Sequence, residues 1–184
     1  MKALLVVVVI AALTSCKRPE PESAGTLPTM ATVGVVRMID YYPPKQSFRC
    51  LAPANWKTEE EEFVGTETAV FRSDEASISI VKNPDGSTKN PEDWANMFAL
   101  LDPKGRPPAL EKTKIDGRMV IQLSRTQPIR KPHSNKLLHE ARERHALITV
   151  PDGFYQIRLS APPESYDSAL PIFDAIVQSF KPKS

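Results

Sequence analysis

Residues 154–180 read FYQIRLSAPPESYDSALPIFDAIVQSF and join a strand pattern directly to a helix pattern. Between Tyr155 and Ala161 apolar and polar side chains alternate, which is the pattern of an antiparallel strand with one buried face. From residue 163 to residue 180 the apolar side chains recur at helical spacing, which predicts a closing helix with one apolar face. Pro171 removes a backbone hydrogen bond, so we expect it in the first turn or at a kink. A sheet covered by a helix indicates the α+β class.

A second helix is predicted over residues 90–101. Asn90 can cap its N-terminus, and Pro91 suits the first helical position. Its apolar residues share one face, which we expect to pack on the core. They are Trp94, Met97, Phe98 and Leu101.

Turn residues divide most of the remaining chain into strands. Asp116-Gly117 predicts a tight hairpin between residues 110–115 and 118–126. A Pro-Asp-Gly turn predicts a second hairpin between residues 140–150 and 154–161. Further strands are expected at residues 33–39, 47–51, 66–71 and 76–81, the acidic run 59–62 in a loop or at a strand edge, and residues 127–135 in an exposed loop.

The N-terminus has the pattern of an export signal. Lys2 precedes an apolar run at residues 3–13. As a helix this run rises only about 16 Å, against about 30 Å of bilayer hydrocarbon, and its length is typical of a signal-peptide core. Leu13-Thr14-Ser15-Cys16 resembles a bacterial lipobox. That resemblance implies cleavage before Cys16, a diacylglycerol thioether on its sulfur and acylation of the new amino group, for example with palmitate.

An ordinary secretory signal is the alternative, but its cleavage favours small flanking residues and Leu13 is unsuitable at one of them. Lys17 after the cysteine resembles the enterobacterial pattern for the outer membrane. The expected organisation is a signal peptide (1–15), a lipidated cysteine with a Pro-rich tether (16–40) and one folded domain (41–184). We therefore expect a bacterial lipoprotein in the cell envelope, held on the membrane by Cys16 and more often on the periplasmic face of the outer membrane than on the inner membrane.

Charge and cysteine content narrow the possibilities further. The net charge of +2 gives no electrostatic footprint for nucleic acid, so no nucleic-acid partner is expected. The chain contains two cysteines. If Cys16 is lipidated, Cys50 has no disulfide partner, and the core must hold the fold unaided. Its apolar neighbours predict a buried, inert thiol at Cys50, with a reactive thiol as the alternative.

The sequence contains little that resembles a catalytic or metal-binding motif. His139-Glu140 followed by His145 superficially resembles the zinc-protease motif, but that motif needs its histidines four residues apart on a helix. On a strand, His139 and His145 would lie about 20 Å apart, too far to share an ion. Nucleophile-elbow and phosphate-binding glycine motifs are absent from the sequence. We therefore expect no catalytic residue, no metal, no cofactor and no enzymatic activity.

A basic segment between residues 125 and 145 is the candidate binding site. Its cations outnumber its acids, and those chosen as binding residues are Arg125, Arg130, Lys131 and Lys136. They could face an acidic protein partner, an anionic lipid headgroup or a glycan. The alternative is a solvated hairpin edge whose cations prevent the addition of another strand.

Two segments resemble the Mog1/PsbP-like fold. Phe48-Arg49-Cys50-Leu51-Ala52-Pro53-Ala54-Asn55-Trp56 resembles its opening strand and Pro-x-x-Trp turn. The run from Phe154-Tyr155 through Pro163, Tyr166 and Phe173 to Ile176-Val177-Gln178-Ser179-Phe180 is similar to its last strand and C-terminal helix. The resemblance covers roughly residues 41–181. It implies an antiparallel β-sheet sandwiched by helices, in a group of mostly binding and assembly factors.

The expected function is therefore a non-enzymatic binding or assembly component of the cell envelope, with a protein partner there. One alternative is an envelope hydrolase or metal-binding protein whose site is assembled from distant residues. Another is a carrier of an apolar ligand, which would need a sizeable apolar cavity.

Overall fold

The computed structural model describes residues 31–33, 36–63, 66–83, 90–97, 108–130 and 137–183. The smaller of its two sheets contains β1 (Ala31–Val33), β2 (Val36–Tyr41), β3 (Phe48–Pro53) and β11 (Lys181–Pro182). The larger contains β4 (Lys57–Phe63), β5 (Thr66–Arg72), β6 (Ser77–Lys82), β7 (Glu111–Ile115), β8 (Arg118–Arg130), β9 (Leu137–Val150) and β10 (Gly153–Ala161).

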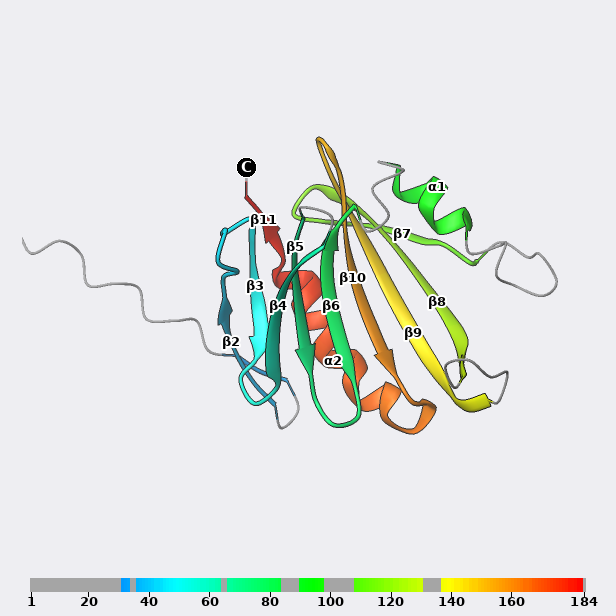
Figure 1. The fold of residues 1–184 in the computed structure, drawn as a ribbon. Coiled ribbons are helices and arrows are strands. Elements are labelled where there is room, and N and C mark those ends of the chain that lie inside the picture. Colours follow the sequence, from blue (N-terminus) through cyan, green and yellow to red (C-terminus); the bar gives the residue numbers. More distant parts are fainter. Residues whose placement is uncertain are drawn as a thin grey trace, which may run out of the picture.

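The strands run in the orders β1-β2-β3-β11 and β4-β5-β6-β10-β9-β8-β7 (Figure 1). Every pairing within the described residues is antiparallel. The α+β class and the antiparallel sheet predicted from the sequence are therefore confirmed. The signal peptide, Cys16 and the tether up to residue 30 lie outside the described residues.

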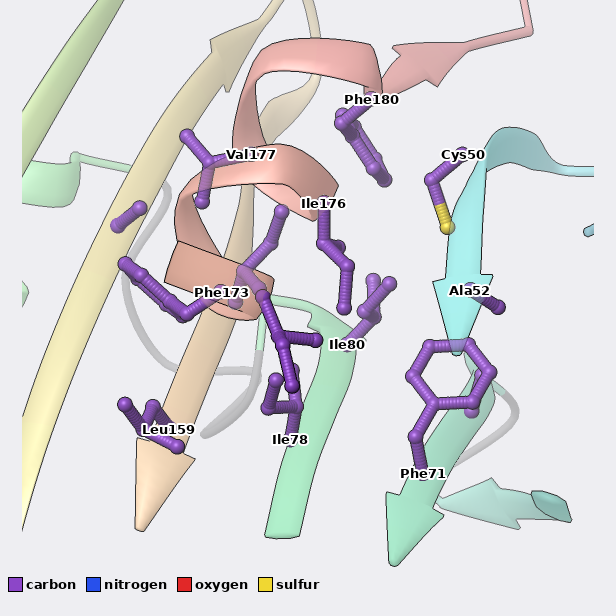
Figure 2. Packing of buried hydrophobic residues seen from close by; sticks show 14 of the residues in the cluster. Cys50, Ala52, Phe71, Ile78, Ile80, Leu159, Phe173, Ile176, Val177 and Phe180 are labelled. Carbon is purple, nitrogen blue, oxygen red and sulfur yellow. The ribbon is translucent and has the colours of Figure 1, made fainter. Parts of the chain in front are cut away.

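The long helix α2 (Pro163–Ser179) packs on one face of the larger sheet. Figure 2 shows its Phe173 and Ile176 among Ile78, Ile80 and Leu159 of the strands. All five side chains are fully buried, because the alternation along β6 and β10 directs their apolar residues to this face. This packing fills the space beneath the sheet and forms the main core.

Pro171 lies inside α2, beyond its first turn, so the first-turn position is excluded and the kink is the alternative that remains. Its side chain is exposed to solvent, away from the buried face of the helix. The apolar face predicted for this helix is otherwise confirmed, since its Tyr166, Phe173, Ile176 and Val177 are buried.

The short helix α1 (Pro91–Asn96) lies on the opposite face of the larger sheet. Asn90 caps it as predicted, because its Oδ1 accepts a hydrogen bond from the amide of Glu92 at 2.9 Å. Trp94 packs on Phe154, which neighbours the α2-facing Tyr155 and therefore points to the other side of the strand. Met97, predicted to share the buried face, is instead 41% exposed. Phe98 and Leu101 lie outside the described residues.

The predicted Asp116-Gly117 hairpin is confirmed. Both residues have positive φ angles, 49° and 77°, as a two-residue turn of this hand requires. The loop predicted at residues 127–135 is wrong in part, because β8 continues through Pro128 to Arg130 and pairs with β9. Pro128 is compatible with a strand because β7 pairs with β8 only up to Gln122, which leaves an edge beyond it.

The strands at the two ends of the described chain also differ from those predicted. The single strand expected at residues 33–39 is replaced by two strands, β1 and β2, and residues after the closing helix form β11 against β3.

The acidic run lies in β4, at the edge of the larger sheet, as predicted. Cys50 is 2% exposed, which confirms its burial. Among the described helices, none has the length and apolar character needed to cross a bilayer.

Candidate functional site

The structure describes only some of the site residues predicted from the sequence. Arg125 lies in β8, and Arg130 ends this strand with its side chain undescribed. Lys131, Lys136 and Cys16 lie outside the described residues. The structure therefore places Arg125 alone among the proposed binding cations.

Arg125 belongs to a buried polar cluster that the sequence did not reveal. Its Nε lies 2.5 Å from Oε2 of Glu143, which is 3% exposed. Antiparallel pairing sets these residues opposite each other on β8 and β9. The next residue on the same face of β9 is His145, whose Nε2 lies 3.2 Å from the same carboxylate oxygen. From β10, Gln156 Nε2 lies 2.8 Å from Nδ1 of His145.

The hydrogen bonds assign a tautomer to His145. Gln156 donates to Nδ1, so the imidazole proton lies on Nε2 and is donated to Glu143. Burial lowers the pKa of His145, although the nearby carboxylate of Glu143 opposes this effect. The ring is therefore neutral near pH 7.

Glu143 remains ionised despite its burial. Burial favours the protonated form, but hydrogen bonds from His145 and Arg125 outweigh it and lower the pKa of Glu143 to about 2. Arg158 Nη1 lies a further 4.0 Å from its other carboxylate oxygen. The negative charge is thus held within a cage of donors from three neighbouring strands.

This cluster is closed to a substrate in the structure. His145 is 1% exposed, and the ring of Trp94 from α1 lies over it with centroids 5.8 Å apart. A general base must reach the proton that it removes, and neither buried group has such access. The cluster therefore links β8, β9 and β10 on the α1-covered face of the sheet. His139, on the same strand, is exposed, and no group of three potential metal ligands occurs within the described residues.

Figure 1 shows the end of the molecule that carries the C-terminus. Residues at this end line an open, cationic groove. It consists of two adjoining cavities of about 570 and 390 Å³ that share Arg118, Pro182 and Lys183. Lys82 and Asp152 line the larger cavity and form an ion pair at 2.5 Å. Arg49 and Lys181 line the smaller cavity. We call this feature the C-terminal groove.

Few local features of the sequence indicate the C-terminal groove. Its cations come from β3, β6, β8 and the chain after α2, which are far apart in sequence. The run Lys181-Pro182-Lys183 was the one local signal, and it reads equally well as a helix end.

Comparison with known proteins supports the fold. No family model matches the chain, and no curated protein matches it in sequence. The structure is similar to the solution structure of cyanobacterial PsbP (CyanoP) from Synechocystis, with a TM-score of 0.51 and 16% identity over 85% of this chain and 99% of that one. At this identity the likeness shows a PsbP-like fold and nothing of the function.

Two further solved structures match at lower TM-scores. One is a Bacteroides thetaiotaomicron protein, with a TM-score of 0.49 and 11% identity over 79% of this chain and 48% of that one. The other is a Pseudomonas aeruginosa protein of unknown function described as a putative regulator, with a TM-score of 0.45 and 14% identity over 80% of this chain and 98% of that one.

Proposed function

We propose that this chain is a lipid-anchored protein of the cell envelope that binds or helps assemble another envelope component and catalyses no reaction. The anchor rests on the sequence, in which a short apolar run leads directly to Leu13-Thr14-Ser15-Cys16. Two or more acyl chains at Cys16 would hold the domain stably on a membrane.

One observation favours binding over catalysis. The histidine and carboxylate that could act together in acid–base chemistry, His145 and Glu143, are sealed within the sheet and its cover. The C-terminal groove, by contrast, is an accessible concave surface, and its side chains are suited to hold a charged partner.

Lipid labelling in cells tests the anchor. Wild-type protein and Cys50→Ala should incorporate radiolabelled palmitate, whereas Cys16→Ala should incorporate none. Cys50→Ala is the matched control because it removes the other cysteine of the chain. Label that persists in Cys16→Ala, or Met1 at the N-terminus of the mature protein by mass spectrometry, would contradict an anchor at Cys16.

Crosslinking in intact cells tests the binding role. Wild-type protein should capture a defined envelope partner, and Cys16→Ala should capture less of it because the tether no longer places the domain correctly. Equal capture by the two proteins would show that binding does not depend on the anchor at Cys16. No reproducible partner in either would count against an assembly role.

A carrier of an apolar ligand is a second candidate. A cavity of about 500 Å³ between the N-terminal strands and α2 is lined by Val33, Val36, Trp56 and Ile172, among others. Trp56 fluorescence should shift to the blue when lauric acid enters this cavity, and Trp56→Phe should abolish that change. An unchanged emission spectrum would remove the carrier from consideration.

A further inference from the structure

Two cations occupy paired positions on neighbouring strands of the smaller sheet, at the C-terminal groove. In the pairing of β3 with β11, Arg49 lies directly opposite Lys181. Like charges in this relationship destabilise a sheet. Lys181 Nζ approaches Asp116 Oδ2 at 3.7 Å, but Arg49 has no carboxylate partner in the described part of the chain.

Two more cations line both cavities of the groove. Neither Arg118 nor Lys183 forms an ion pair with any residue that the structure describes. Lys82, by contrast, is held by Asp152. The fold therefore gathers cations in one concavity and leaves part of their charge without a balancing carboxylate, at a cost that a bound anion would offset.

We propose that the C-terminal groove is a binding site for a phosphate group, carried by a small ligand or by a lipid headgroup. This inference deepens the proposed function, because it names the chemistry that the binding domain recognises. The larger cavity has the size of a small-molecule site, which typically measures about 300–1,000 Å³. The planar guanidinium of Arg118 can form two parallel hydrogen bonds to phosphate oxygens.

A compact anion suits this groove better than an added peptide strand. The amide of Lys183 donates to Ser47 O at 2.9 Å. Because hydrogen bonds to the partner strand alternate along an antiparallel strand, the backbone nitrogen of residue 182 points away from β3. Residue 182 is a proline and has no N–H to offer an incoming strand. A phosphate monoester concentrates nearly two negative charges in one group, which suits a concavity that Arg118 and Lys183 both line.

Titration calorimetry with two probes tests the site on the full chain in a neutral detergent. Inorganic pyrophosphate represents free phosphate compounds, and glycerophosphoglycerol represents the headgroup of an anionic lipid without its acyl chains. At least one probe should bind wild-type protein, and the affinity should fall as salt screens the charges. Arg118→Ala/Lys183→Ala should weaken that binding by at least about tenfold.

Lys57→Ala/Arg72→Ala is the matched control. It removes the same two residue types from β4 and β5, at the edge of the larger sheet where both cations contact Glu59. Lys57 and Arg72 form exposed ion pairs, which contribute little to stability, and Arg118 and Lys183 form none with the residues that the structure describes. Both double variants should therefore keep the wild-type melting temperature. The control should bind the probes as wild type does.

The two probes identify the source of the phosphate. Binding of pyrophosphate alone points to a free phosphate compound, and preferential binding of glycerophosphoglycerol points to a lipid headgroup. Equal weakening in the two double variants, or no binding of either probe up to about 10 mM, would overturn the proposal. Binding of poly-L-glutamate that depends on Arg118 and Lys183, without phosphate binding, would overturn it in favour of an acidic protein segment.

The result is independent of the anchor. A lipidated Cys16 together with an empty groove would refute only the phosphate site. Phosphate binding by a chain without lipid would refute only the anchor.

Discussion

Gly153 lies against the side-chain amide of Asn83, with no room between them for a β-carbon. Asn83 follows β6 and Gly153 begins β10. Asn83 Oδ1 also accepts a hydrogen bond from the amide of Phe154 in β10 at 2.9 Å. The amide of Asn83 donates in return to Phe154 O at 2.9 Å. This contact fixes the turn between β9 and β10 to the end of β6, beside the C-terminal groove.

Gly153→Ala should therefore destabilise the protein. The new methyl group would displace Asn83, and the φ angle of 143° is one that residues with a side chain rarely adopt. We expect the free energy of unfolding to fall by about 2–4 kcal/mol in urea denaturation.

Gly117→Ala is the control for this substitution. Gly117 also has a positive φ angle, 77°, but no atom lies within 4 Å of a β-carbon placed there. The expected loss is about 1 kcal/mol, from backbone strain alone. Equal losses at the two positions would show that the contact with Asn83 is unimportant.

Stability should fall on acidification because of Glu143. Its pKa is about 2 in the folded chain against 4.5 for an unperturbed group, so the unfolded chain binds the proton first as pH falls. The contribution of Glu143 is complete above about pH 4.5 and is lost progressively down to about pH 2. Glu143→Gln should flatten this part of the stability curve. At pH 7 it should cost about 2–3 kcal/mol, because the half-buried guanidinium of Arg125 loses the carboxylate that balances its charge.

His145 adds to this pH dependence at higher pH. Burial lowers its pKa below 6.5, so the unfolded chain again takes up the proton first, and stability should begin to fall below about pH 6.5. His145→Gln should remove this earlier loss while the later loss due to Glu143 remains. If NMR shows that His145 itself titrates at or above pH 6.5 in the folded chain, this assignment is contradicted.

Thiol labelling should distinguish the two cysteines. Burial raises the pKa of the Cys50 thiol, and the side chain is inaccessible, so the folded protein should not react with a thiol reagent such as DTNB at Cys50. In urea the chain should expose one reactive thiol if Cys16 carries a lipid and two if it does not. Rapid labelling of the folded Cys16→Ala variant would show that Cys50 is accessible after all.

Pro171→Ala should stabilise the protein. Alanine would supply a backbone N–H for the carbonyl of Asp167 one helical turn earlier, which Pro171 cannot do. We expect the free energy of unfolding to rise by about 1–2 kcal/mol, measured by thermal and urea denaturation. Pro163→Ala, at the first position of the same helix, should be neutral or slightly destabilising, because proline is favourable there. A loss of stability in Pro171→Ala would mean that the helix has adapted fully to the proline.

Local patterns were sufficient to predict many of the elements. The alternation between Tyr155 and Ala161, the cap at Asn90 and the Asp116-Gly117 turn each depend on residues close together in the sequence. The burial of Cys50 could likewise be inferred from its apolar neighbours. These signals indicated an antiparallel sheet with helices before any long-range contact was known.

Edge positions and register were decided by the tertiary structure. Pro128 indicated a loop in the sequence, yet it lies in β8 where none of the described strands pairs with its outer side. The sequence indicated Arg125 as part of a basic segment that either binds a partner or forms a solvated hairpin edge. The register of β8 on β9 instead sets Arg125 opposite Glu143 and buries that carboxylate.

The sequence by itself determined the secondary structure of most of the folded domain and the lipobox-like N-terminus, because both depend on neighbouring residues. Only the tertiary structure brought Arg49, Arg118, Lys181 and Lys183 into one groove, since they reach it from separate strands and from the chain after α2. Charge accumulates there through the pairing of distant segments, and no local pattern of side chains encodes that proximity.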